Sequence, residues 1–325
     1  MDNSTKLRLL YILKILKEQT DEMHFLTTTD FINILEEDYG IKSHRHTIKK
    51  DIEVLREFGY EIEEVKSKQN QYNLFDRKFD IPELKLLIDA VASSKFIPEQ
   101  KSKELIEKLS SLASIYASTT LRRNIGCENR TKAKNENIYI NIDKINEAIN
   151  KKKKISFQYF KYDVNKNKCM KHNGDRYILS PLHLIWSGDY YYLVGVYDYD
   201  NKVRNFRIDR IMPNLIILDE IANKAPDDFV LEVYLNTTFR MFNSQCEDVE
   251  LFVENDVVDA IIDRFGLDID IKVCDDKHFS VVVNVAVSHI FFCWIFGFEG
   301  KVRIVGPESV NKRYKKMINN VVNTI

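Results

Sequence analysis

Apolar residues recur every three or four positions in the first segment of the chain. The stripe runs through residues 6–18 and predicts a first helix. A second helix follows residues 27–29, three threonines whose side-chain oxygens can cap its start, and Gly40 is placed to end it. We therefore expect two helices before the chain reaches residue 41.

A third helix and two strands are predicted next. The helix has its apolar residues at i, i+4 and i+7, with Ser43 placed to cap it and Gly59 to close it. Residues 60–65 and 71–75 then read as two short strands joined by a polar turn. Three helices and a hairpin predict a winged helix-turn-helix over residues 1–78.

The pattern becomes purely helical after this hairpin. Pro82 and Pro98 bracket apolar residues at helical spacing, which predicts a helical connector over residues 79–137. Its last part, residues 122–137, is rich in Asn, Lys, Arg and Glu and indicates a loop or hinge. We place a domain boundary there.

Residues 138–222 change to short strands separated by polar turns, after a helix over 144–152. Several closely spaced short strands predict a small β-barrel. The expected strands cover residues 156–162, 176–185, 190–197 and 204–211.

The last segment, residues 223–325, predicts the order βαββαβ, which is ferredoxin-like. Its most apolar run, 281–298, is interrupted by Asn284, Ser288 and His289. A membrane span needs about 20 mainly apolar residues, so we expect a buried strand and a buried helix here and no membrane association. The expected fold class is multidomain α+β.

Composition narrows the function. A length of 325 residues predicts two or three domains, and 44% hydrophobic with 30% charged residues is a globular balance. Lys and Arg total 48 against 49 Asp and Glu, so any nucleic-acid binding must come from local charge.

The cysteines and the N-terminal segment point to the cytoplasm. The five cysteines lie far apart without a C-x-x-C pair, which argues against a zinc site or a disulfide scaffold. No signal peptide is visible in the first thirty residues. We expect a cytoplasmic protein with no metal ion and no cofactor.

The third helix carries a basic face away from its apolar stripe. Such a face can enter the major groove, where Arg and Lys reach guanine edges or phosphates, although a basic helix face can also be simply solvated. Residues 1–80 hold 13 Lys and Arg against 16 Asp and Glu, but the basic ones are clustered. The candidate contacts to double-stranded DNA are Ser43, His44, Arg45, His46, Thr47, Lys49 and Lys50, with Lys66 and Lys68 at the wing tip.

The chain resembles known regulators in three places. Residues 39–60, YGIKSHRHTIKKDIEVLREFGY, resemble the recognition region of DeoR-like winged helix-turn-helix regulators. Residues 180–195, SPLHLIWSGDYYYLVG, and 204–211, RNFRIDRI, resemble a WYL domain, with Tyr191 in place of the signature Trp. Residues 292–307 are similar to the extension that often follows WYL domains.

This resemblance implies a bacterial transcriptional regulator that acts as a homodimer. WYL domains have an Sm-like or SH3-like barrel and are regarded as effector sensors, some binding single-stranded nucleic acid and others an unidentified ligand. The positions that correspond to the ligand pocket are Ser180, His183, Tyr191, Arg204 and Arg207.

The chemistry of the arginines agrees with an anionic ligand. Planar guanidinium groups beside aromatic rings bind phosphates and stack on bases. Arg210 is a third candidate, but alternation in a strand puts Arg204 and Arg210 on one side and Arg207 on the other, so we expect two of the three in the site. Asp209 is expected to pair with Arg210 or Arg207.

Three hypotheses follow. The leading one is a DNA-binding regulator whose WYL domain senses an anionic ligand, either single-stranded nucleic acid or a nucleotide. The second is a non-regulatory adaptor that holds single-stranded nucleic acid. The third, an enzyme acting on nucleotides, lacks any Walker A, G-x-G-x-x-G, G-x-S-x-G or H-E-x-x-H pattern, so we expect no enzyme.

Overall fold

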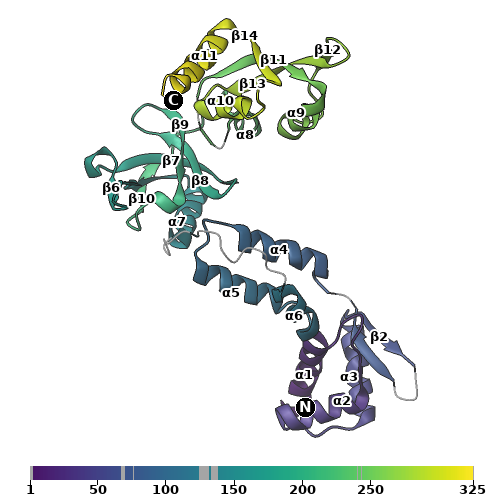
Figure 1. Ribbon diagram of the computed structural model, residues 1–325. Helices are drawn as coiled ribbons and strands as arrows, with labels where there is room; N and C mark the ends of the chain where they lie inside the picture. The colour runs from purple at the N-terminus through teal and green to yellow at the C-terminus, as the bar shows by residue number, and fades with distance from the viewer. Residues whose placement is uncertain are drawn as a thin grey trace. The chain divides into compact units, whose positions relative to one another are not determined.

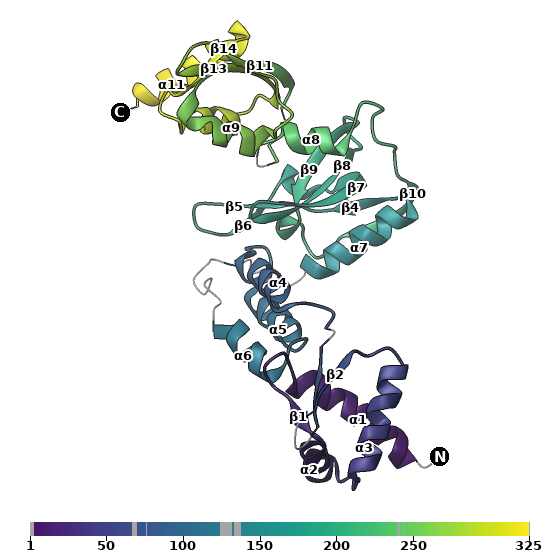
Figure 2. The same ribbon diagram turned by 90° about the vertical axis from the view of Figure 1, so that its right-hand side faces the viewer.

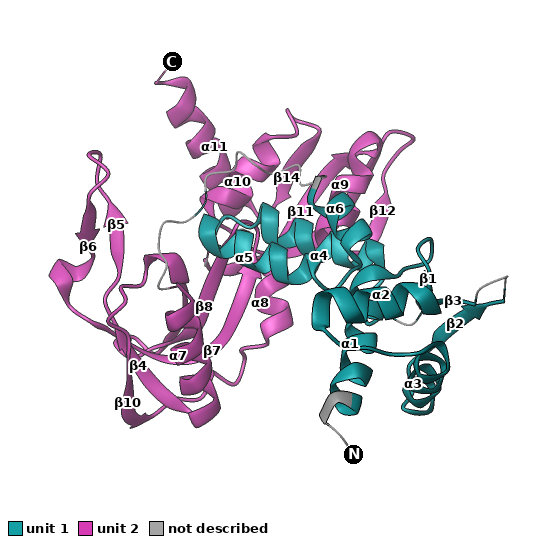
Figure 3. Cartoon of the chain, turned by 90° about the horizontal axis from the view of Figure 1, so that it is seen from below, with its two compact units in different colours: residues 1–136 teal, residues 137–325 magenta. Residues whose placement is uncertain are grey.

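The chain forms two compact units, residues 1–136 and 137–325 (Figure 3). In the computed structural model the described residues are 3–66, 70–75, 77–123, 132, 138–239, 241–242 and 244–324. Within these ranges the chain is a mixture of helices and small antiparallel sheets, in agreement with the predicted α+β class.

The first unit begins with three helices and a small sheet of order β1-β3-β2 (Figure 1). The capping box of α2 is complete, because the Thr27 hydroxyl accepts from the Asp30 amide and the Asp30 carboxylate accepts from the Thr27 amide. Gly40 ends α2 in the left-handed conformation, as predicted. The elements are α1 (Asn3–Gln19), β1 (Leu26–Thr27), α2 (Thr28–Tyr39), α3 (Arg45–Glu57), β2 (Ile62–Val65) and β3 (Gln71–Leu74).

The start of α3 differs from the sequence prediction. His44 occupies the N-cap position and makes no side-chain capping bond, while the Ser43 hydroxyl is buried without a hydrogen-bond partner. The prediction that Ser43 caps this helix is therefore wrong. The helix is instead held by its buried face and by an ion pair of 2.6 Å between Arg8 of α1 and Asp51.

Three helices follow in the first unit, α4 (Ile81–Ser93), α5 (Glu99–Ser110) and α6 (Ile115–Arg123). They share a small apolar core that includes Leu84 and Leu121. Side chains join them to the segment that follows α1: Ser114 donates a hydrogen bond of 2.5 Å to Asp21, and the rings of His24 and Tyr116 stack 3.7 Å apart. These contacts could not be predicted from the sequence, because Ser114 and Asp21 are 93 residues apart in the chain.

The second unit opens with α7 (Ile138–Lys151) and a five-stranded antiparallel sheet of order β10-β4-β7-β8-β9. A separate hairpin, β5–β6, extends away from this sheet (Figure 2). The strands pair in this linear order, and an isolated antiparallel bridge between Tyr159 and Ile211 also joins the chain after β4 to the chain after β9. The strands are β4 (Lys153–Phe157), β5 (Phe160–Tyr162), β6 (Lys168–Met170), β7 (Tyr177–Ser187), β8 (Tyr190–Tyr197), β9 (Lys202–Arg207) and β10 (Ile216–Ile221).

Two of the predicted strands end differently in the structure. The strand expected over residues 156–162 is divided into β4 and β5. The strand expected over 204–211 stops at Arg207, and residues 208–210 form a 3-10 turn with Ile208 buried. Strand alternation therefore does not extend to Arg210, which corrects the prediction that it shares a face with Arg204.

The last part of the second unit has its own four-stranded sheet of order β12-β13-β11-β14. After α8, the elements follow in the predicted order βαββαβ, and alternate residues of β11 and β13 pack with three helices in one core. Residues 281–298 form most of β13 and all of α10, and no described helix is long and apolar enough to span a membrane. The bounds are α8 (Leu231–Thr237), β11 (Cys246–Glu254), α9 (Val258–Phe265), β12 (Ile271–Val273), β13 (His278–Ala286), α10 (His289–Phe296), β14 (Val302–Gly306) and α11 (Glu308–Val322).

Candidate functional site

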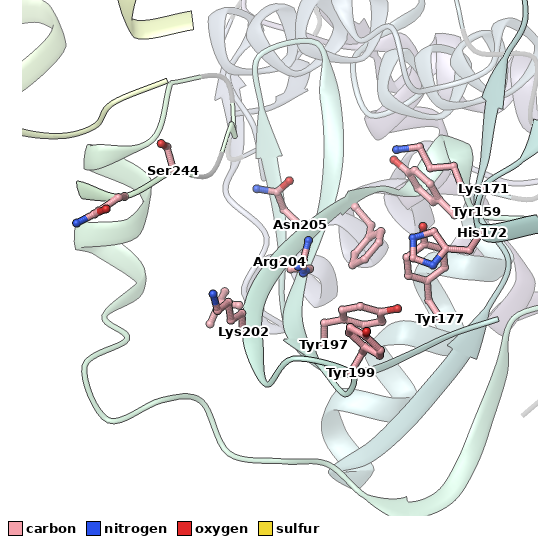
Figure 4. Close-up of a pocket in the computed structure, with 13 residues that line it drawn as sticks. Tyr159, Lys171, His172, Tyr177, Tyr197, Tyr199, Lys202, Arg204, Asn205 and Ser244 are labelled. Carbon is pink, nitrogen blue, oxygen red and sulfur yellow. The ribbon is translucent and has the colours of Figure 1, made fainter. Parts of the chain in front are cut away.

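A pocket of about 900 Å³ lies beside the edge strand β9 in the second unit (Figure 4). It combines aromatic side chains with basic ones, and β9 contributes five consecutive residues to it. The lining residues are Tyr159, Lys171, His172, Tyr177, Tyr197, Tyr199, Lys202, Val203, Arg204, Asn205, Phe206, Ser244 and Gln245.

Strand register determines which side chains meet here. Residue Gly195 of β8 lies opposite Arg204 of β9, and Leu179 of β7 lies opposite Tyr197. A Cβ at position 195 would lie 2.6 Å from the Ser180 carbonyl oxygen, so the close approach of β7 and β8 requires glycine. This packing fixes the strand beside Arg204.

An aromatic cluster forms one wall of the pocket. The ring of Tyr177 lies edge-on to Phe206 at 5.1 Å and tilted to Tyr197 at 5.5 Å between centroids. Tyr159 is buried, which raises its pKa to about 12, and its hydroxyl oxygen accepts a 3.1 Å hydrogen bond from the Arg207 amide. Tyr199 is 89% exposed, so its ring is available for stacking at the mouth.

Basic side chains surround this wall. The Arg204 guanidinium lies 5.4 Å from the Tyr197 ring centroid, and the Lys171 ammonium lies 5.6 Å from that of Tyr159. Asp200 accepts a hydrogen bond from Arg204, which lowers the pKa of Asp200 and raises that of Arg204. With Lys202 and His172, four basic side chains line a pocket whose lining contains no carboxylate among the described residues.

Of the six predicted ligand residues, Arg204 lines this pocket. Ser180 is fully buried in β7, where its hydroxyl accepts a 2.8 Å hydrogen bond from the Asn223 amide. His183 is half-buried, with its ring 6.3 Å from that of Phe229, and burial lowers its pKa. Tyr191 is also half-buried, and burial raises its pKa.

Arg207 and Arg210 lie outside the pocket lining. The Arg207 guanidinium is 3.2 Å from the Tyr190 ring centroid and forms a 2.7 Å ion pair with Asp209. Burial works to lower the pKa of Arg207, but the hydrogen bond and charge of Asp209 together with Tyr190 raise it above its ordinary value. The predicted structural pairing of Asp209 is confirmed. Arg210 is half-buried in the 3-10 turn.

Most residues of the pocket could not be identified from the sequence. Lys171 and His172 follow the β5–β6 hairpin and read as ordinary turn residues, and Tyr177 and Tyr197 read as strand residues. The sequence shows a basic pair, Lys171 and His172, shortly before a strand that begins with Tyr177. It does not show that this pair and the strand tyrosines line the same pocket.

The predicted DNA-binding residues gather around the start of α3. His44, Arg45, His46, Lys49 and Lys50 are exposed there. Arg45 donates a 3.3 Å hydrogen bond to the Thr29 hydroxyl of α2, while Ser43 and Thr47 are half-buried. Lys66 is exposed after β2, and Lys68 lies outside the described residues.

The part of the chain that the structure describes offers no metal centre. It contains no group of three or more His, Cys, Asp and Glu side chains that could hold a metal ion. Four described cysteines are free thiols, and Cys127 lies outside the described residues.

The strands that carry the pocket fall within a known domain. Residues 141–213 match the family model of the WYL domain. The chain contains a WYL domain. This match includes Tyr159, Lys171, Tyr177, Tyr197 and Arg204, and so most of the pocket lining lies within the WYL domain.

Two solved structures are remotely similar to the chain beyond the WYL domain. Proteasome accessory factor B/C (PafBC) of Arthrobacter aurescens is 15% identical over 97% of this chain, with a TM-score of 0.32. The chain spans about half of that protein, covering 48% of it. A CRISPR Cas-related protein is 12% identical, with 100% of this chain and 92% of that chain covered and a TM-score of 0.38. No curated protein matches this sequence.

Proposed function

We propose that this chain is a DNA-binding transcriptional regulator whose WYL domain binds an anionic ligand, either single-stranded nucleic acid or a nucleotide. The observation that carries the proposal is the pocket in which Arg204, Lys171 and Lys202 lie around an aromatic wall. Aromatic side chains stack on bases, and fixed cations bind phosphates. A ligand that carries both a base and a phosphate can therefore contact the aromatic wall and the basic side chains at once.

The expected stacking energy and the volume of the pocket are both adequate for a specific ligand. Stacking of one base on an aromatic side chain contributes about 1–3 kcal/mol. A cavity of about 900 Å³ is at the upper end of the range for small-molecule sites. The bond between Asp200 and Arg204 competes with the ligand phosphate, so a ligand must replace or share it.

The exposed basic face at the start of α3 supports the DNA-binding half of the proposal. Arg45, Lys49 and Lys50 project from a helix that Asp51 ties to α1, so the helix can present them as a rigid surface. Residues 1–78 act as a winged helix-turn-helix in this proposal, and two copies of the chain bind the two halves of an operator.

Ligand binding must favour one of two states of the dimer for the WYL domain to regulate DNA binding. The coupling free energy is typically 1–3 kcal/mol. Residues 79–137 join the winged helix-turn-helix to the WYL domain in sequence, and we assign them the role of lever.

The test is fluorescence-anisotropy binding of labelled DNA from upstream of the protein's own gene, with and without short single strands. We expect tight duplex binding that resists random duplex and shifts when single strand is added. Arg204→Ala should leave duplex binding intact and remove the shift. Arg303→Ala, which removes an exposed guanidinium from β14, is the matched control and should keep the shift.

Other outcomes favour other functions. If the protein binds its upstream duplex much less than roughly 10³-fold more tightly than random duplex, but binds single strands tightly, the result favours the non-regulatory adaptor that holds single-stranded nucleic acid. We propose no catalytic activity, and Mg²⁺-dependent turnover of a nucleotide would contradict that.

A further inference from the structure

The β5–β6 hairpin is a well-formed arm with a tightly bonded turn. Asp163 accepts hydrogen bonds from the Asn167 amide at 2.8 Å and, through its carbonyl, from the Lys166 amide at 3.1 Å. Five residue steps from Phe160 to Asn165, at about 3.3 Å each, give the arm a reach of roughly 16 Å. Figures 2 and 3 both show the hairpin extending away from the main sheet of its unit.

Positive charge is concentrated on this arm. Lys161, Lys166 and Lys168 are all exposed, and Asp163, the one acidic residue between Phe160 and Met170, is occupied by the turn. The Lys168 ammonium lies 4.7 Å from the ring centroid of buried Phe160. Tyr162, which is 53% exposed, lies opposite Lys168 and adds an aromatic surface on that face, while Lys161, opposite Cys169, is on the other face of the hairpin.

The base of the arm is part of the pocket wall. Tyr159 stands immediately before β5 and Lys171 immediately after β6, and both line the pocket. The Lys171 amide donates a 2.8 Å hydrogen bond to the Tyr159 carbonyl, so the two ends of the hairpin are tied together at this wall. The arm therefore begins where this wall of the pocket ends.

We propose that the pocket and the β5–β6 hairpin form one continuous track for a single-stranded oligonucleotide. A base stacks in the pocket, and the following nucleotides wrap the narrow arm, with phosphates near Lys161 on one face, Lys168 on the other and Lys166 at the turn. A mononucleotide places its phosphate within the pocket, where Arg204 and Lys202 lie, and leaves the arm unused. This inference rests on the proposed function and chooses the oligonucleotide over the nucleotide as its ligand.

The experiment compares thymidine monophosphate with single-stranded oligothymidylates of two, four and eight nucleotides, over a series of salt concentrations. The test variant is Lys161→Gln/Lys166→Gln/Lys168→Gln in the full chain. The control variant, Lys272→Gln/Lys277→Gln/Lys315→Gln, removes the same charge from exposed positions of the C-terminal part of the unit.

For the wild type we expect affinity to rise with oligonucleotide length. The hairpin variant should bind the octamer at least tenfold more weakly, and its slope of log affinity against log salt should be smaller by about 0.7 for each lost phosphate contact. Its affinity for the monophosphate should be unchanged, which also shows that the pocket is folded. The control variant should follow the wild type.

Equal octamer binding by the hairpin and control variants would overturn the track and leave the proposed ligand pocket standing. Wild-type protein that binds neither monophosphate nor oligonucleotide would overturn both. If the triple variant loses the monophosphate as well, Lys166→Gln alone replaces it, and an unchanged salt slope for that variant would refute the proposal.

Discussion

The Asn205 side chain donates a 2.8 Å hydrogen bond to the hydroxyl of Tyr234, which joins the edge strand β9 to α8. The same amide group donates a 2.6 Å bond to the Met241 carbonyl. Arg204, the preceding residue, points to the opposite face of β9 and lines the pocket. The strand β9 therefore carries the pocket arginine and is tied, through the next residue, to the C-terminal part of the unit.

Replacing Asn205 tests this attachment. Asn205→Ala leaves the Tyr234 hydroxyl and the Met241 carbonyl without their donor, and an unsatisfied buried group costs about 1–3 kcal/mol. We expect a loss of roughly 2 kcal/mol in the free energy of unfolding, measured by urea denaturation. A double-mutant cycle with Tyr234→Phe isolates the bond, and strictly additive effects would show that the two residues are not coupled.

The ion pair between Arg8 and Asp51 should be important for the first unit. Its two side chains are only 12% and 10% exposed, and Arg8 Nε approaches Asp51 Oδ2 to 2.6 Å. Asp51→Ala leaves Arg8 partly buried without its partner, so we expect a destabilisation of about 3 kcal/mol.

Chemical denaturation monitored by circular dichroism measures this change. Glu99→Ala breaks the exposed pair with Lys103 and serves as the control, with no measurable loss expected. If the two variants are equally stable, the pair does not hold α3 to α1.

Regular elements could be predicted where local pattern determines them. The bounds of β8 follow from an apolar and aromatic run between two polar turns, and Gly40 is placed where a left-handed residue ends α2. The order βαββαβ from β11 to β14 follows in the same way from alternating strand and helix patterns. These features depend on neighbours in sequence.

The pocket could not be predicted because it depends on strand register and on a hairpin. Arg207 and Arg204 are three residues apart, yet they lie on opposite faces of β9, and the 3-10 turn then ends the alternation before Arg210. Lys171 reaches the wall only because β5 and β6 pair and return the chain to Tyr159. Resemblance to WYL domains supplied Arg204 but not the residues around it.

Gly195 should not tolerate a side chain. An alanine Cβ there would lie 2.6 Å from the Ser180 carbonyl oxygen and 2.7 Å from Leu179, which is closer than packed atoms come. Overpacking of this kind costs about 1–3 kcal/mol and would shift β7 against β8. We expect Gly195→Ala to lower both thermal stability and ligand affinity.

The control for this variant is Gly297→Ala, where the added Cβ would lie 3.4 Å from the Trp294 carbonyl oxygen. That variant should unfold at nearly the wild-type temperature in differential scanning calorimetry. Wild-type behaviour of Gly195→Ala would show that β7 and β8 can separate at little cost.

Tyr159 should make the second unit sensitive to alkaline pH. Burial raises its pKa to about 12 from the ordinary value of 10.0, so the folded state keeps the phenol proton more strongly than the unfolded state does. A raised pKa contributes stability that is complete below pH 10 and is lost as pH rises through the folded value. Between pH 9 and 11 this group alone should remove roughly 1.3 kcal/mol.

Urea denaturation of wild type and Tyr159→Phe at both pH values isolates this contribution from other titrating groups. Phenylalanine cannot lose a proton, so the stability of the wild type relative to the variant should fall between pH 9 and 11. Tyr199→Phe is the matched control, because Tyr199 is 89% exposed and its replacement removes a phenol without touching the buried hydroxyl of Tyr159. A stability difference between wild type and Tyr159→Phe that stays constant with pH would contradict the burial of this hydroxyl.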